Sequence, residues 1–293
     1  MYKYIKSAIG ILIFLTSCNN GDDQADAFGN FETRETIVAA EVNGKIIKLE
    51  IDEGQVLKAN ELIGIIDTIQ LYLNFTQVAA KKKSVQAKLS TIDANVKVLE
   101  AQKESLETEL KRVKKLIEDD AATTQKLDDL EGKLDVLNNQ IKSTLVQKNS
   151  IYAEIQSMYA QLAMIEDQIQ KCKIINPIDG TVLEKYVEPH ELVAAGKSIY
   201  KIADLSEMDL RVYVSGSQLS DIKIGQEITV MFDKNKDENS ELKGIITWIS
   251  SKAEFTPKII QTKEERVNLV YAVKVKVKND GSIKIGMPGE IKW

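Results

Sequence analysis

From residue 71 to residue 172, apolar side chains recur at alternating spacings of four and three residues. One run extends from Leu71 to Ile117, and a second extends from Leu127 to Cys172. This is a heptad pattern, which lines one face of a helix with apolar residues. The polar stretch 118–124 between the runs is too short to do more than turn the chain back. The pattern therefore predicts an antiparallel coiled-coil hairpin over residues 69–172, roughly 75 Å long at 1.5 Å per residue.

The hairpin is continuous in sequence, because no proline occurs before Pro177. Four polar residues interrupt its apolar runs: Lys82, Lys103, Thr144 and Lys148. We interpret them as positions that set the register or extend along the surface to water, and not as binding sites. A hairpin of this kind is also typical of dimerisation and spacer coiled coils, so the periodicity alone leaves the function open.

A repeated segment flanks the hairpin on both sides. At an offset of 136 residues, Gly44 aligns with Gly180, Ile46 with Val182 and Ile66 with Ile202. Short apolar stretches punctuated by glycine predict strands joined by tight turns. The segments 36–68 and 173–205 together resemble a split biotinyl/lipoyl domain. The single histidine, His190, aligns with Gly54 and is expected to be a turn residue.

Beyond residue 206 the pattern changes to short alternating stretches, at residues 208–214, 227–232, 244–249 and 270–277. Alternation with a period of two predicts half-buried strands, here of a small antiparallel β-barrel over residues 206–293. Residues 217–221 are expected to form a short helix capping it. The predicted fold class is thus α+β and elongated, with the helical hairpin inserted in a split lipoyl-like β domain and followed by the barrel.

The first residues are typical of an export signal. Lys3 and Lys6 precede a short apolar run, which ends in Leu15-Thr16-Ser17-Cys18 and looks like a bacterial lipobox. The resemblance implies removal of residues 1–17 and acylation of Cys18, and two or three acyl chains anchor a protein stably. An ordinary signal with a chance cysteine is the alternative. Residues 18–35 are expected to be a flexible tether, and Cys172 a small buried hydrophobe.

Composition excludes several classes of protein. The formal net charge of -5 disfavours nucleic-acid binding, which needs a clustered positive surface. With one histidine and two cysteines, there is little material for a metal site or a catalytic constellation. We therefore expect no enzyme activity, no cofactor and no metal. A lipoyl-type carrier subunit is also disfavoured, because no Met-Lys-Met tip exists.

The order of these parts resembles the HlyD-type periplasmic adaptor, or membrane fusion protein, family. Detailed similarities are Pro177-Ile178-Asp179-Gly180 before the second lipoyl half, and Phe255-Thr256-Pro257 and Gly286-Met287-Pro288-Gly289 in the barrel. Family members that dock TolC-like channels carry a motif across the hairpin tip. This chain matches it with Arg112, Leu116, Thr123, Leu127 and Asp128, but has Thr123 where the family has serine.

The resemblance implies an adaptor in tripartite efflux or secretion. The partners would be an inner-membrane transporter and a TolC-like outer-membrane channel, contacted by Arg112, Leu116 and Thr123. It also implies a homo-oligomeric ring, expected to be a hexamer, in the periplasm of a Gram-negative bacterium, lipid-anchored at Cys18 to the inner membrane. The long hairpin, and a chain that ends directly after the barrel, favour an ABC-type transporter over a proton-driven pump. The alternative is a structural coiled-coil lipoprotein that spans the envelope without a transporter.

Overall fold

The computed structural model describes residues 25–233, 239–255 and 269–293. The expected signal peptide 1–17, Cys18 and the Thr256-Pro257 signature lie outside these residues. The chain divides into two compact units. One spans Glu35–Ala203, and the other combines Asp204–Trp293 with the residues before Glu35, so that the chain passes between the units twice.

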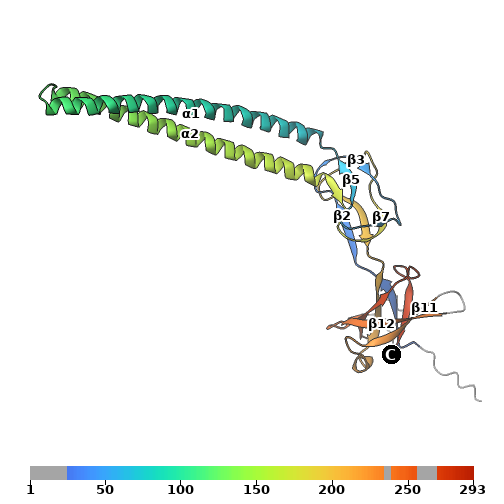
Figure 1. Cartoon of the computed structure of the whole chain (residues 1–293). Coiled ribbons are helices and arrows are strands. Elements are labelled where there is room, and N and C mark those ends of the chain that lie inside the picture. Colours follow the sequence, from blue (N-terminus) through green and yellow to red (C-terminus); the bar gives the residue numbers. More distant parts are fainter. Residues whose placement is uncertain (1–24, 234–238, 256–268) are drawn as a thin grey trace, which may run out of the picture. The chain divides into compact units, whose positions relative to one another are not determined.

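The first unit contains the predicted hairpin, made of α1 (Ile69–Glu118) and α2 (Thr124–Lys171) (Figure 1). The apolar runs of the two helices face each other, as expected. Val85, Ile155 and Met158 form one buried cluster, and Leu110, Val113 and Leu130 form another closer to the tip. The heptad pattern alone therefore identified both helices and the face that each one buries.

The polar residues that interrupt the apolar runs have specific partners. Lys148 Nζ lies 2.7 Å from the Asp93 carboxylate on the opposite helix, and this hydrogen bond raises the pKa of the lysine. Lys82 Nζ lies 4.2 Å above the ring centre of Tyr159, also across the hairpin. Both lysines thus join the helices at points where the apolar run is broken, as positions that set the register would do.

The ends of the hairpin enter the predicted lipoyl-like domain, which consists of two four-stranded sheets in the orders β2-β9-β7-β4 and β6-β5-β3-β8. Their apolar faces enclose one core, in which Ile46, Ile66, Val182 and Ile202 are almost fully buried. The strands are β2 (Glu35–Ala39), β3 (Gly44–Leu49), β4 (Val56–Leu57), β5 (Leu62–Ile66), β6 (Lys173–Ile175), β7 (Gly180–Lys185), β8 (Leu192–Val193) and β9 (Ser198–Ala203).

The internal repeat is also present in the backbone. Gly54 has φ 84° and its aligned residue His190 has φ 76°, so both occupy the left-handed region that suits a tight turn. The Gly54 N–H donates to the Val182 carbonyl, and the His190 N–H donates to the Ile46 carbonyl, each at 2.8 Å. These two bonds are related by the same offset of 136 residues. His190 is therefore a turn residue, as the alignment predicts.

One buried polar cluster breaks this symmetry. Asn176 and Tyr200 are fully buried, whereas the residues aligned with them are Ala40 and Gly64. The Tyr200 hydroxyl donates to the Asn176 side-chain carbonyl at 2.8 Å. The Asn176 amide donates to the Lys58 and Ile178 carbonyls at 2.8 and 2.6 Å. Asn176 thus holds together three segments that are distant in sequence, and burial raises the pKa of Tyr200.

We expect Asn176→Ala to destabilise this unit by roughly 2–3 kcal/mol, because it leaves buried hydrogen-bonding groups without partners. Tyr200→Phe, which removes only the hydroxyl, should cost about 1 kcal/mol. Urea unfolding followed by helical circular dichroism measures both. Equal stability of Asn176→Ala and the unchanged protein would show that the cluster contributes nothing.

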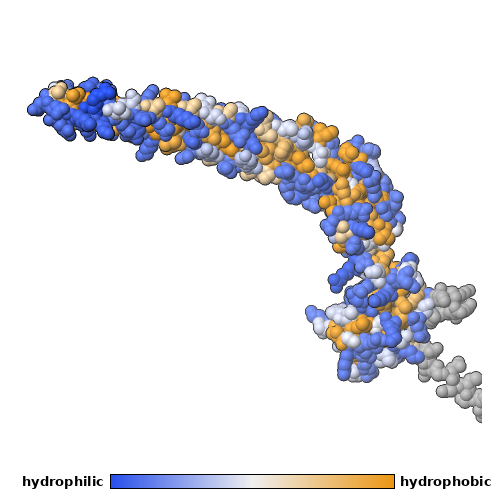
Figure 2. All heavy atoms as spheres, in the orientation of Figure 1, coloured by the Kyte–Doolittle hydropathy of each residue, from blue (hydrophilic) through white to orange (hydrophobic). Residues whose placement is uncertain are grey.

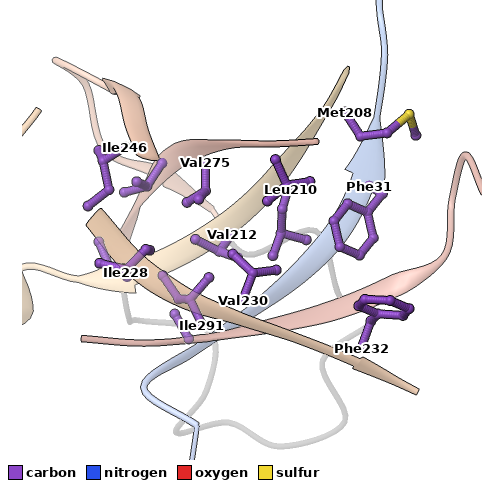
Figure 3. Packing of buried hydrophobic residues seen from close by; sticks show 14 of the residues in the cluster. Phe31, Met208, Leu210, Val212, Ile228, Val230, Phe232, Ile246, Val275 and Ile291 are labelled. Carbon is purple, nitrogen blue, oxygen red and sulfur yellow. The ribbon is translucent and has the colours of Figure 1, made fainter. Parts of the chain in front are cut away.

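The second unit is an antiparallel barrel, and Figure 3 shows its core. Its strands pair in the order β10-β1-β15-β11-β12-β14, and β14 pairs again with β10, which closes the ring. The short strand β13 extends the sheet beside β14. The strands are β1 (Ala27–Glu32), β10 (Glu207–Ser215), β11 (Glu227–Asp233), β12 (Asn239–Ile249), β13 (Glu254–Phe255), β14 (Leu269–Lys278) and β15 (Pro288–Lys292), with a short helix η1 (Gln218–Asp221).

Strand β1 corrects the sequence-based expectation of a flexible tether over residues 18–35. Ala27–Glu32 lies between β10 and β15 and hydrogen-bonds to both. Phe31 is 1% exposed, and its ring packs edge-on against Phe232 with centres 6.2 Å apart. The barrel therefore consists of both ends of the chain, and without β1 it would have two unpaired strand edges.

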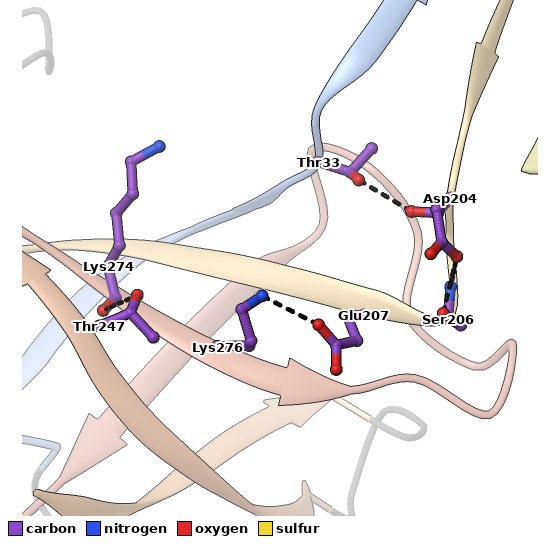
Figure 4. Close-up of polar contacts among 7 residues, drawn as sticks. All are labelled: Thr33, Asp204, Ser206, Glu207, Thr247, Lys274 and Lys276. Carbon is purple, nitrogen blue, oxygen red and sulfur yellow. Dashed lines mark hydrogen bonds and ion pairs between the residues drawn. The ribbon is translucent and has the colours of Figure 1, made fainter. Parts of the chain in front are cut away.

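Polar contacts hold the chain where it enters and leaves the barrel (Figure 4). The Thr33 hydroxyl donates to the Asp204 carbonyl at 3.0 Å, which links the two crossing segments. The Ser206 N–H and hydroxyl both donate to the Asp204 carboxylate, and these bonds lower its pKa. Nearby, Lys276 pairs with Glu207 between β14 and β10 at 2.9 Å. The segment after β1 is thus tied to the segment before β10, and β10 is tied to β14.

Candidate functional site at the hairpin tip

The tip begins where α1 ends in a Schellman-type turn. Asp120 adopts a left-handed conformation with φ 54°. Its N–H donates to the Ile117 carbonyl at 3.0 Å, and the Ala121 N–H donates to the Leu116 carbonyl at 2.7 Å. These two bonds satisfy carbonyls that the end of a helix would otherwise leave free. The reversal of the chain is therefore well defined, although it contains no glycine.

Helix α2 begins after Thr123, whose backbone is extended with φ −94° and ψ 149°. Threonine at this position usually caps the helix with its hydroxyl. Here the side chain makes no capping bond. It is exposed, and among the described residues its hydroxyl has no hydrogen-bond partner. The fold therefore does not use the Thr123 side chain, which leaves it open to the contact role that the family resemblance implies.

A small apolar cluster packs between the end of α1 and the start of α2, next to the turn. Leu110, Val113 and Leu130 are buried there, and Ala122 and Leu127 pack against them. Leu127 is half-buried, so its place in the tip motif also reflects its packing role. This cluster fixes the two helix ends relative to each other and so presents the turn as a rigid surface.

The structure brings the three predicted contact residues to the exposed end of the rod. Arg112 and Thr123 are exposed, and Leu116 is 40% exposed although it is a large apolar residue. Among the described residues, Arg112 forms no salt bridge, whereas the nearby Lys114 pairs with Glu131 across the hairpin at 3.0 Å. The tip thus offers a cation, an apolar side chain and a hydroxyl that the fold itself does not use.

The acidic residues Glu118, Asp119 and Asp120 follow directly at the end of α1, and all are exposed. Carboxylates at the C-terminus of a helix oppose its dipole by about 0.3–1 kcal/mol each. Their presence is therefore not explained by the stability of α1. It is consistent with a surface whose composition serves recognition.

Within the described residues, no three His, Cys, Asp or Glu side chains lie close enough together to hold a metal ion. Cys172 is buried, which raises the pKa of its thiol. Over the same residues, no helix has an apolar stretch long enough to cross a bilayer.

Comparison with known proteins identifies the family. Residues 34–205, more than half of the chain, match the family model described as RND MFP, barrel-sandwich hybrid domain, where MFP stands for membrane fusion protein. The chain belongs to the membrane fusion protein family. Residues 204–292 match a second model, the LcnD-like C-terminal domain. Membrane fusion proteins are periplasmic adaptors of efflux systems, so the coarse function inferred from the order of domains is confirmed.

Individual relatives agree with this assignment. The UPF0194 membrane protein YE2891 of Yersinia enterocolitica is 26% identical over 99% of this chain and 98% of its own length. The crystal structure of MacA from Actinobacillus actinomycetemcomitans superposes with a TM-score of 0.65 at 24% identity, over 90% of this chain and 76% of MacA. The membrane fusion protein Spr0693 of Streptococcus pneumoniae superposes with a TM-score of 0.51 at 13% identity, over 90% and 96% of the two chains. These likenesses confirm the fold of a membrane fusion protein.

Proposed function

We propose that this membrane fusion protein links an ABC-type inner-membrane transporter to a TolC-like outer-membrane channel, with the hairpin tip as the contact to the channel. The observation that carries the proposal is the exposure of Arg112, Leu116 and Thr123 together at the tip, without partners in the fold. Residues that are kept exposed and unpaired on a rigid turn suit recognition of another protein. Copies of the chain would form a ring, expected to be a hexamer, through which the substrate passes.

The base of the assembly would be held by lipid on Cys18. Ala27, the first residue of β1, follows Cys18 by only nine positions. A fully extended chain of that length spans about 30 Å. An anchor at Cys18 would therefore keep the barrel close to the membrane surface, where it can meet a transporter. The periplasmic face of the inner membrane is the location that this role requires.

In-cell photo-crosslinking from a reactive residue at position 123 tests the proposal directly. Capture of an outer-membrane channel, identified by mass spectrometry, is the expected result. Capture of only copies of the chain or of peptidoglycan-associated proteins would favour the structural lipoprotein that spans the envelope. The same crosslink from position 86, an exposed glutamine far from the tip, serves as the control for random collisions.

The class of transporter needs its own experiment, since the matching family model is named for RND adaptors. Crosslinking in membranes followed by purification through a tag on this chain should recover an ABC transporter. Recovery of an RND pump in its place would overturn this part of the proposal and leave the role of the tip intact.

Replacing Cys18 by alanine should release the protein from the membrane, because the acceptor of the acyl chains is lost. We expect the variant to appear in the soluble periplasmic fraction and export to fall sharply. Intact-mass measurement of the unchanged protein should show the added lipid. A Cys18→Ala variant that stays with the membrane and keeps its mass would contradict the assignment of the anchor.

A further inference from the structure

The outward faces of the two helices carry a second heptad pattern, opposite the buried one. Starting at Ala80 and stepping by four and three residues in turn, α1 presents nine exposed residues up to Thr108, all of them Ala, Ser, Thr or Val. The same steps from Gly132 to Met164 on α2 meet ten exposed residues, which are Gly, Ala, Ser, Val, Asn or Met. We call these the outer row of α1 and the outer row of α2.

Such rows are not expected on a helix face that remains in water, where charged residues dominate. Residues 80–108 include ten charged side chains, yet none of them falls in the outer row of α1. The outer row of α2 contains no charged residue either, and its Val136, Val146 and Met164 are 59%, 61% and 66% exposed. Apolar residues are visible along the surface of the hairpin in Figure 2. Both faces therefore have the composition of contact surfaces.

The pattern fits a second copy of this chain as the occupant. The two rows have nearly the same length and the same repeat, so each can pack along the other over its whole length. The row on α1 consists mainly of small residues, which let another helix approach closely, and the row on α2 supplies the larger valines and a methionine. When hairpins stand side by side with their tips at one end, α1 of one copy neighbours α2 of the next in antiparallel orientation.

Charge selects one register for this pairing. If Val98 lies opposite Val146 of the neighbour, the flanking Glu104 comes beside Lys142 and Lys111 comes beside Asp135. Sliding the neighbour by seven residues sets Val98 opposite Asn139 and brings Glu104 beside Asp135, a like-charged pair. The flanking residues are exposed and form no salt bridge among the described residues. Flanking charges of this kind determine register in coiled coils.

We propose that the outer row of α1 packs antiparallel against the outer row of α2 of a neighbouring copy, in the register that sets Val98 opposite Val146. The inference rests on the ring of the proposed function and names the surface and the alignment that build its wall. Within one chain these two valines lie on the outer faces of different helices, so contact between them requires two copies.

Disulfide crosslinking in cells tests the pairing. One copy carries Val98→Cys and one tag, and a second copy carries Val146→Cys and a different tag. Oxidation should yield a dimer that contains both tags. The yield of this dimer should be severalfold higher than in the same experiment with Asn139→Cys in place of Val146→Cys. Cys172 is buried, so copies without an added cysteine should not crosslink. Equal or absent crosslinking for the two cysteine pairs would overturn the proposed register.

A charge reversal adds a second readout on the full-length chain. Glu104→Lys places like charges beside Lys142, and we expect the two-tag dimer to fall roughly three- to fivefold. Combining it with Lys142→Glu should restore the dimer. A double variant that crosslinks no better than Glu104→Lys alone would contradict the pairing.

These crosslinks can be measured in cells that lack any partner transporter or channel. Dimers that persist there would uphold the outer-row contact independently of any partner. If position 123 also captures no channel in cells that contain one, the adaptor role is refuted while the contact stands. Normal export without the dimer would refute the contact and leave the adaptor role standing.

Discussion

Thr123→Asp is expected to abolish export while the protein remains folded. The Thr123 side chain is exposed and makes no hydrogen bond in the fold, so its replacement removes nothing that stabilises the hairpin. An aspartate at the start of α2 is even a good helix cap. In a complex with an outer-membrane channel, the same carboxylate would be desolvated without a partner, which costs several kcal/mol. Export assays in cells, with thermal unfolding of the purified variant, measure the two effects separately.

Matched variants separate a contact at the tip from a general effect of charge. Thr123→Ser keeps the hydroxyl and should retain export. Gln86→Asp adds the same charge on an exposed helical position far from the tip and should have no effect. Arg112→Ala should also abolish export while the protein remains folded. The exposed guanidinium forms no salt bridge among the described residues, so its loss removes a contact to the channel and none within the fold. Unchanged export in both Arg112→Ala and Thr123→Asp would remove the tip from the proposed interface.

Gly29→Ala should have the largest effect on stability, because it acts where β1 closes the barrel. Gly29 lies between Val212 on β10 and Gly289 on β15. A Cβ atom at this position would stand 1.8 Å from the Arg211 carbonyl oxygen, so the strands must move apart. We expect a loss of about 3 kcal/mol, the upper end of the usual cost of overpacking a core.

Both tryptophans, Trp248 and Trp293, belong to the barrel unit, so their fluorescence reports on the barrel while helical circular dichroism reports on the hairpin. In urea, Gly29→Ala should shift the fluorescence transition and leave the helical signal almost unchanged. Gly216→Ala is the control in the same unit, because an added Cβ there meets only the Tyr271 ring at 3.8 Å. A fluorescence midpoint for Gly29→Ala equal to that of the control would show that β1 is not required for closure.

Much of this architecture could be predicted because its signals are local or repeated. The 4-3 spacing of apolar residues requires only neighbouring turns of one helix, and it identified α1, α2 and the face that each buries. The offset that aligns Gly54 with His190 predicted a shared turn, and both residues have the left-handed conformation. The tip residues were found through a family resemblance, and their exposure follows from their position at a helix reversal.

Strand β1 shows what such reasoning misses. Its alternation of Ala27, Gly29 and Phe31 on one face was readable, but polar neighbours and the nearby expected anchor favoured a tether. What makes it a strand is pairing with β10 and β15, roughly 180 and 260 residues further along the chain. The unused hydroxyl of Thr123 was likewise not predictable, because capping depends on the rotation of a single side chain.

By itself, the sequence determined the helical hairpin, the duplicated β domain and the alternation of the later strands, since periodicity records which face of each element must leave water. Only the tertiary structure decided that the first strand closes a barrel built from the other end of the chain. It alone decided as well that Arg112, Leu116 and Thr123 remain unpaired at the tip. The physical reason is that strand pairing and the hydrogen bonding of side chains depend on partners distant in sequence. No local pattern records which residues those partners are.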